Sequence, residues 1–122
     1  MNIQVSWDND EKTIIRFDYG KGWTWDDFSE ANEIVQKMYA EVKHPVHIIA
    51  NFEDGAFPPL GALEKFREAQ EDMPDDAVVV VVGGSMFITT LVSTFSRIYK
   101  ALSKTLMVAD SLDNAREKIA KL

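Results

Sequence analysis

Five consecutive valines, Val78 to Val82, constrain the fold of this 122-residue chain more than any other feature. Valines in an unbroken row, rather than alternating with polar residues, predict a strand buried on both faces, which is typical of a central strand in a parallel sheet. Two glycines and Ser85 follow directly, and then a long, mostly apolar segment from Met86 to Leu102. The pattern indicates an α/β architecture in which this strand leads through a tight turn into a helix.

Composition narrows the class of protein. The chain contains no cysteine, which excludes disulfides, thiolate metal ligands and a cysteine nucleophile. Its 122 residues are a common length for one domain, so we expect residues 1–122 to form a single domain. The first seven residues lack a basic leader, and the longest apolar run stops at Gly83, well short of a membrane span. We therefore expect a cytoplasmic protein.

Net charge bears on the kind of partner. The formal charge of −7 argues against nucleic acid, because affinity for phosphate backbones comes largely from clustered Lys and Arg. The charge is also uneven, since residues 51–76 carry 8 acids and 2 bases whereas residues 77–122 carry 3 acids and 6 bases. In one interpretation, this uneven charge only reflects solvated surfaces that differ by chance. In the other, it creates an electrostatic field that orients a protein partner or a second copy of the chain.

Periodicity predicts the secondary structure. The expected strands are Ile3–Trp7, Thr13–Tyr19, Val46–Phe52, Val78–Val82 and Thr105–Ala109, and the expected helices are Trp25–Val42, Leu60–Met73, Met86–Ser103 and Leu112–Leu122. Asp8-Asn9-Asp10 supplies the turn of an antiparallel hairpin. Thr24 is expected to cap the first helix, and Trp23 and Phe28 occupy the two positions of a hydrophobic staple.

The order of these elements predicts an α/β fold with a mixed, mostly parallel sheet of about five strands, a leading antiparallel hairpin and four helices. In such sheets, ligands and partners meet the loops at the carboxyl ends of the parallel strands. Three loops are expected to share that edge. Their candidate binding residues are Asn51, Asp54, Gly83, Gly84, Ser85, Asp110 and Ser111.

The Gly83-Gly84-Ser85 turn has three possible roles: a helix cap, an anion-binding site or the site of a nucleophilic serine. A glycine turn before a helix can cradle an anion, but no Lys follows as in a P-loop and no third glycine as in a dinucleotide fingerprint. The motif of a nucleophilic serine between a strand and a helix requires glycine two residues after the serine, where this chain has Phe87. The catalytic histidine of such enzymes follows the serine along the chain, and no histidine follows Ser85. The sequence therefore favours a tight turn with Ser85 as helix cap, and it predicts no catalytic residue.

The two histidines do not suggest a metal site. His44 and His47 lie three residues apart across Pro45, and no third ligand is indicated, so surface or hydrogen-bonded histidines are favoured. We expect no metal and no cofactor.

The third predicted helix carries apolar residues over an unusually wide arc. Burial between the sheet and a neighbouring helix accounts for the whole arc in one interpretation. In the other, the edge of the arc forms a dimer or partner surface. The interface candidates are Ile88, Val92, Phe95 and Tyr99.

The element order resembles that of the STAS domain, in its SpoIIAA-like branch, which is sometimes grouped with SEC14-like lipid-binding folds. The segments that carry the resemblance best are Val78 to Ser85 and Met107 to Ala115. In anti-sigma-factor antagonists of that family, a Ser or Thr in the loop after the third strand is phosphorylated to switch partner binding. The matching stretch, Asn51 to Gly61, contains neither Ser nor Thr, so the resemblance implies a module without the phospho-switch.

Two functional hypotheses follow. The first is a non-enzymatic, STAS-like regulatory or protein-interaction module that meets a protein partner or a second copy through the loop edge and the third helix. The second is a carrier for an apolar or lipid-like small ligand, which the SEC14-like resemblance implies and the aromatic residues Trp23, Trp25, Phe57 and Phe95 favour.

Overall fold

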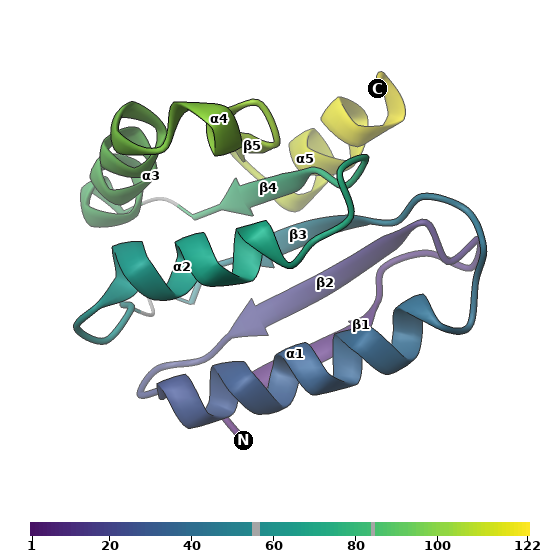
Figure 1. The fold of residues 1–122 in the computed structure, drawn as a ribbon, viewed down its shortest axis with the longest axis horizontal. Helices are drawn as coiled ribbons and strands as arrows, with labels where there is room; N and C mark the ends of the chain where they lie inside the picture. The colour runs from purple at the N-terminus through teal and green to yellow at the C-terminus, as the bar shows by residue number, and fades with distance from the viewer. Residues whose placement is uncertain (55–56, 84) are drawn as a thin grey trace.

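A five-stranded mixed sheet organises the chain in the computed structural model, which describes residues 1–54, 57–83 and 85–122 (Figure 1). The strands are β1 (Ile3–Trp7), β2 (Ile14–Tyr19), β3 (His47–Asn51), β4 (Val79–Val82) and β5 (Leu106–Ala109), and they lie in that order across the sheet. β1 pairs antiparallel with β2, and every later pair is parallel. The predicted fold class is confirmed.

The helices are α1 (Trp25–Tyr39), α2 (Ala62–Glu71), α3 (Met86–Ile98), the single turn α4 (Lys100–Ser103) and α5 (Leu112–Ala120). The sequence predicts one helix from Met86 to Ser103, but the backbone leaves helical geometry at Tyr99, where φ is −112° and ψ is 66°. The chain has to turn there because β5 begins beside Val79 only a few residues later. Within the described ranges, no helix combines the length and apolarity needed to cross a membrane.

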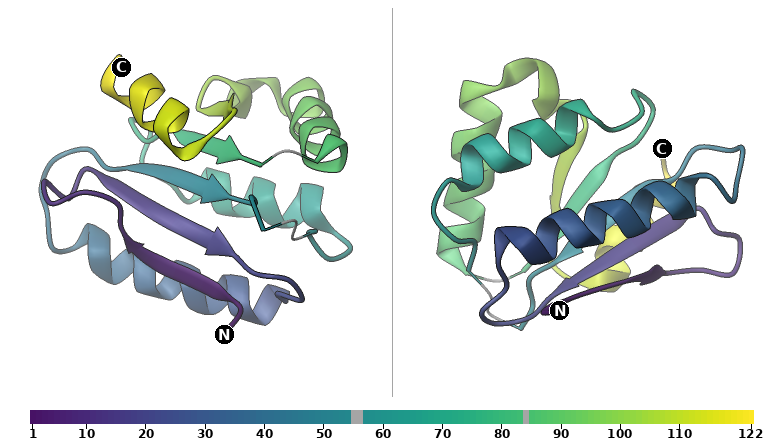
Figure 2. Two further views of the ribbon diagram at one scale, coloured as in Figure 1. Left: turned by 180° about the vertical axis from the view of Figure 1, so that it is seen from behind. Right: turned by 60° about the horizontal axis from the view of Figure 1, so that its bottom comes forward.

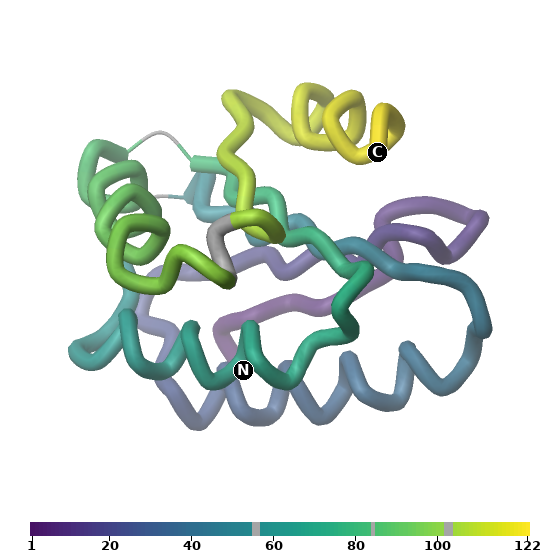
Figure 3. The backbone as a smooth tube through the Cα atoms, turned by 45° about the horizontal axis from the view of Figure 1, so that its top comes forward, coloured from purple at the N-terminus to yellow at the C-terminus, as the bar shows by residue number. Residues whose placement is uncertain are grey.

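The strand order decides which face each helix covers. Each parallel connection moves one strand further in the same direction, and right-handed crossovers then place all their helices on the same face. Helices α1, α2 and α3 accordingly pack on one face, whereas α5, which follows the last strand, packs on the other. Figure 3 shows α5 above the strands with α1 and α2 below them, and Figure 2 shows α5 in front when the molecule is seen from behind.

The valine strand is buried from both sides, as predicted. Val80 and Val82 are 0% exposed and pack with residues of α5, whereas Val79 and Val81 face the three-helix side. β4 lies between β3 and β5, so it is an interior strand although β3 is the middle one. A continuous valine run suits this position because both side-chain rows meet apolar partners.

Local signals account for the ends of the first elements. Asn9 Oδ1 accepts hydrogen bonds from the backbone N–H groups of Thr13 (3.0 Å) and Ile14 (3.3 Å), which closes the hairpin turn. Thr24 caps α1 in a reciprocal capping box with Asp27, each side chain accepting from the other's backbone at 3.1 Å. The predicted hairpin and first cap are confirmed.

Candidate functional site

A cavity of about 160 Å³ lies between the sheet and the helices α1, α2 and α3. Its floor is formed by residues of four strands and by Phe52 after β3, and its walls come from the three helices. The floor residues are Phe17, Tyr19, Ile48, Ala50, Phe52, Val79, Val81 and Leu106. The volume is close to that of an engineered cavity of about 150 Å³ that takes up benzene.

Helix α2 stands over this cavity rather than packing tightly on the sheet. It is amphipathic, yet none of its residues is buried. Its inward residues Phe66 and Ala69 are half-buried and line the cavity, together with Met73 just beyond the helix.

Aromatic rings close the cavity at the N-terminal ends of α1 and α2. Phe66 of α2 lies 5.5 Å, ring centroid to centroid, from both Trp25 and Phe28 of α1, and the rings are nearly perpendicular. Trp25 Nε1 also donates to the carbonyl oxygen of Leu60 at 2.8 Å, which ties α1 to the loop before α2. These contacts hold the two helices together at this end.

Polar side chains surround the cavity at the other end of the same helices. Asn32 and Gln36 of α1 and Asp72 at the end of α2 line it, and both Gln36 and Asp72 are exposed to solvent. The cavity therefore opens to water between α1 and the C-terminal end of α2. Gln70 lies nearby and donates to Thr105 Oγ1 at 2.7 Å, which ties this end of α2 to the loop before β5.

Tyr39, the last residue of α1, lines the cavity, and its buried hydroxyl has no hydrogen-bond partner among the residues that the structure describes. Burial raises the pKa of this hydroxyl to about 12, and the negative charge of Asp76 adds to the rise. Tyr39 is therefore a neutral donor at physiological pH. A buried donor without an acceptor is costly, because it has lost its bond to water and gained none in exchange.

Asn51, Ser85 and Ser111 lie along one edge of the sheet, and their side chains are engaged in local structure. Asn51 pairs with Val82, and Val82 with Ala109, which brings the three loops together. Asn51 Nδ2 donates to Asp18 at 2.8 Å, and its Oδ1 accepts from the backbone of Glu53 at 3.0 Å. Asp54 is exposed, and Gly84 lies outside the described residues.

The serines of that edge are helix caps. Ser85 Oγ accepts from the backbone N–H of Ile88 at 3.2 Å, and Ser111 Oγ accepts from that of Asn114 at 3.0 Å. The backbone N–H of Asp110 donates to the Asn114 side chain at 3.1 Å. The capping interpretation of Ser85 is confirmed.

Close packing explains Gly83. A Cβ atom at this position would lie 2.9 Å from the Cβ atom of Phe52. Phe52 is in turn fixed by its backbone N–H, which donates to the carbonyl oxygen of Val82 at 2.6 Å. The glycine permits this close approach of two chain segments.

The interface candidates on α3 need correction. Ile88 and Phe95 are only 3% and 4% exposed, so they are core residues, and Val92 is half-buried and lines the cavity. Tyr99 is half-buried against the ring of Phe95, at 5.1 Å between centroids. The apolar arc is wide because α3 lines the cavity as well as packing on the core, which periodicity alone does not distinguish from an exposed interface.

The exposed apolar residues near the carboxyl edge are different ones. Met86 is 85%, Phe57 59% and Phe87 50% exposed, and the rings of Phe57 and Phe87 meet at 5.5 Å. We call these three residues the apolar edge patch.

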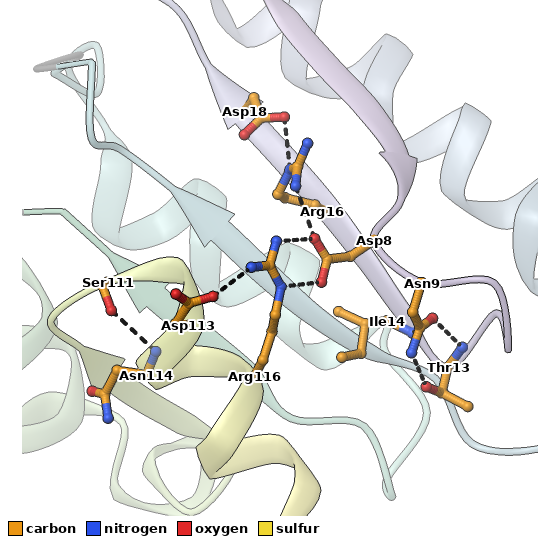
Figure 4. A network of polar contacts seen from close by, with 10 residues as sticks. All are labelled: Asp8, Asn9, Thr13, Ile14, Arg16, Asp18, Ser111, Asp113, Asn114 and Arg116. Carbon is orange, nitrogen blue, oxygen red and sulfur yellow. Dashed lines mark hydrogen bonds and ion pairs between the residues drawn. The ribbon is translucent and has the colours of Figure 1, made fainter.

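An ion network covers part of the opposite face of the sheet (Figure 4). The Asp8 carboxylate, whose side chain is 1% exposed, accepts from Arg116 Nε (2.8 Å) and Nη2 (2.9 Å) and from Arg16 Nη1 (2.8 Å). These arginine hydrogen bonds and charges hold the pKa of Asp8 below its ordinary value, although burial opposes them. Arg116 Nη1 also donates to Asp113 at 3.0 Å, so each of its three side-chain nitrogens makes a hydrogen bond, and the network fastens α5 to the hairpin.

The two histidines lie at the amino end of β3. His47 Nδ1 accepts from the backbone N–H of Val78 at 3.0 Å, and burial lowers the pKa of His47, with Asp76 acting in the opposite direction. His44 is exposed. In the part of the chain that the structure describes, no group of three metal-ligating side chains occurs.

Comparisons with models of protein families, with curated proteins and with solved structures find no match to this chain. The site is therefore defined by its own geometry. Sequence reasoning missed the cavity, although it had noted aromatic residues around it: Phe95 lines the cavity and Trp25 closes one end. The signal that was overlooked is the pair of small residues Ala50 and Ala69, which leave space between the layers.

Proposed function

We propose that this domain is a non-catalytic binding protein for a small apolar molecule, which occupies the cavity beneath α1, α2 and α3. The observation that carries the proposal is the cavity itself, whose floor is formed by aliphatic and aromatic side chains. Its volume of about 160 Å³ suits one six-membered ring or a short alkyl chain. The half-buried position of α2 supports entry from the side of that helix.

The resemblance to the STAS domain is a second argument for the proposal. The sequence resembles the STAS-like, SpoIIAA-like pattern, and that resemblance favours a regulatory or carrier module over an enzyme. The polar groups of the carboxyl-edge loops serve as caps and turn contacts, so the proposal assigns ligand binding to the cavity and not to these loops. We place this role in the cytoplasm because the chain has no cysteine.

Two variants of α2 test the proposal. Ala69 lines the cavity and Ala62 does not, although both are half-buried residues of the same helix. We expect Ala69→Phe to fill the cavity and abolish binding, whereas Ala62→Phe leaves it intact. Toluene is the probe, and saturable shifts of the backbone amide resonances in α2 and β3 are the measurement.

Native mass spectrometry of gently purified protein provides a second measurement. A copurified apolar molecule that is present in the wild-type protein and absent from Ala69→Phe supports the proposal. Toluene that causes no saturable shift in the folded wild-type protein would contradict it, as would equal binding to the Ala69→Phe variant.

A second candidate function is self-association through the apolar edge patch. Contiguous exposed aromatic rings, as in Phe57 and Phe87, are a feature of interaction surfaces. Light scattering tests this with Phe87→Glu and, as a control, Thr90→Glu, which alters another exposed residue of α3. A dimer mass that is lost only in Phe87→Glu supports self-association, and a monomer mass for the wild-type protein excludes it.

A further inference from the structure

The charges around the cavity bear on the kind of molecule it takes up. Of the described residues that line the cavity, none is Lys, Arg or His, whereas Asp72 lines its opening. A carboxylate or phosphate head group needs a cation or several N–H donors to replace its hydration. Lys37 is the cation nearest to the opening in sequence, but it does not line the cavity. An anionic head group would therefore lie beside the negative charge of Asp72, with no positively charged side chain among the described lining residues to offset it.

Neutral polar groups complete the opening. Asn32 is half-buried and Gln36 is exposed, one turn further along α1, and each side-chain amide offers both a donor and an acceptor. At the other end, the rings of Trp25, Phe28 and Phe66 close the space to polar groups. The cavity is thus polar at the end that opens to water, and apart from Gln70 and the hydroxyl groups of Tyr19 and Tyr39 the rest of its lining is apolar.

We infer that the ligand is a short amphiphile with an uncharged or cationic head, which lies at the opening beside Asn32, Gln36 and Asp72 while an apolar ring or chain fills the cavity. This inference rests on the proposed function and adds the ligand class to it. Fatty acids and other anionic amphiphiles are disfavoured. The negative charge of the segment 51–76, which contains 8 acids and 2 bases, acts in the same direction.

Three probes of nearly equal shape separate the inference from the proposed function. Toluene has no head group, benzylamine is a cation at neutral pH and benzoate is an anion. Unit charges about 4 Å apart in water change an affinity about fivefold. We expect benzylamine to bind at least about fivefold more tightly than benzoate at low salt, and the ratio to shrink as salt screens the charge.

Asp72→Asn is the critical variant, and Asp75→Asn is its matched control. Both remove one negative charge from an exposed residue at the end of α2, but only Asp72 lines the cavity. Asparagine is compatible with the C-cap position that Asp72 holds, so the helix is expected to persist. We expect Asp72→Asn to reduce the preference for benzylamine at least twofold and Asp75→Asn to leave it nearly unchanged.

The outcomes distinguish the two proposals. If toluene binds but benzoate binds as well as benzylamine, or if both variants change the ratio equally, the ligand class is wrong and the cavity proposal stands. If toluene, benzylamine and benzoate all fail to bind the folded protein, the proposed function is wrong and the inference is lost with it.

Discussion

The two faces of the sheet are built from the same strands but packed in different ways. On the face of α5, Ile49, Val80 and Val82 are 0% exposed and meet the small residue Ala115, so the helix lies close to the strands. On the other face, three helices cover the same sheet and leave a cavity of about 160 Å³ with a buried, unpartnered hydroxyl. The face under α1, α2 and α3, which we call the crossover face, thus holds an apolar cavity, whereas the hollow on the α5 face is lined by polar side chains such as Asp8, His47 and Arg116 as well as by Ile14 and Ile119.

Topology explains part of this difference. Three successive right-handed crossovers place α1, α2 and α3 side by side on one face, where each helix is positioned by the two strands it connects. Filling the space between them then depends on side-chain size, and Ala50 and Ala69 are small. Helix α5 connects no strands, so it settles where packing and the Asp8–Arg116 pair are best. The apolar cavity therefore lies on the face where the strands, rather than side-chain packing alone, set the positions of the helices.

Neighbouring isoleucines of β3 provide the largest test of this contrast. Ile49 is buried on the α5 face, and Ile48 lines the cavity on the other. We expect Ile49→Ala to reduce the free energy of unfolding by about 4 kcal/mol and Ile48→Ala by about 2.5 kcal/mol, because a side chain beside a cavity has fewer contacts to lose. Urea unfolding measures both. Equal losses would mean that the two faces are packed alike.

The ion network is the second test. Asp8→Asn leaves Arg16 and Arg116 facing a neutral amide, and because both arginines are partly exposed to solvent, loss of the buried carboxylate should cost about 2 kcal/mol of stability. The control Asp10→Asn alters an exposed acid of the same hairpin turn and should change the stability by less than about 0.5 kcal/mol. Thermal unfolding measures both variants. A small loss for Asp8→Asn would show that α5 is held by packing alone.

Acid should weaken the α5 face in particular. The pKa of His47 is lowered in the folded protein, so below its ordinary value of about 6.5 the unfolded chain binds the proton first. The stability from neutral His47 is complete above that pH and is lost as the pH falls towards the folded pKa. The pKa of Asp8 is also lowered, so its contribution is lost only at pH values below about 4.

Histidine variants check this pH dependence. We expect His47→Gln to remove the decrease in unfolding free energy between pH 7.5 and 5.5, while the exposed His44→Gln retains it. Urea unfolding at the two pH values is the measurement. A decrease of the same size in His47→Gln would assign the effect to other groups.

Sequence reasoning succeeded where local chemistry decides the structure. The valine run, the caps at Thr24, Ser85 and Ser111, and the hairpin turn at Asn9 all depend on neighbours a few residues away. Periodicity and capping preferences report such interactions directly, so the element order and the fold class were predicted.

Features that depend on distant residues were not predicted. Asp8 and Arg116 are separated by 108 positions, and neither residue type indicates that they meet. A cavity forms where the side chains do not fill the space between the sheet and the helices. The hydrophobic pattern shows which residues are buried, but it does not show whether their volumes fill that space. For the same reason periodicity alone makes Ile88 and Phe95 interface candidates, because residues buried against a core and residues buried against a partner show the same apolar pattern.

The smallest expected effect on stability concerns Tyr39, which lines the cavity on the crossover face. Tyr39→Phe removes a buried hydroxyl that has no hydrogen-bond partner, so we expect the free energy of unfolding of the unliganded protein to rise by up to about 1 kcal/mol. Tyr99→Phe, at a half-buried tyrosine on α3, is the control and should change little. Calorimetry of ligand-free protein measures both. If Tyr39→Phe instead destabilises the protein, the Tyr39 hydroxyl finds a hydrogen-bond acceptor in solution. The buried polar groups on the crossover face would then be hydrogen-bonded after all.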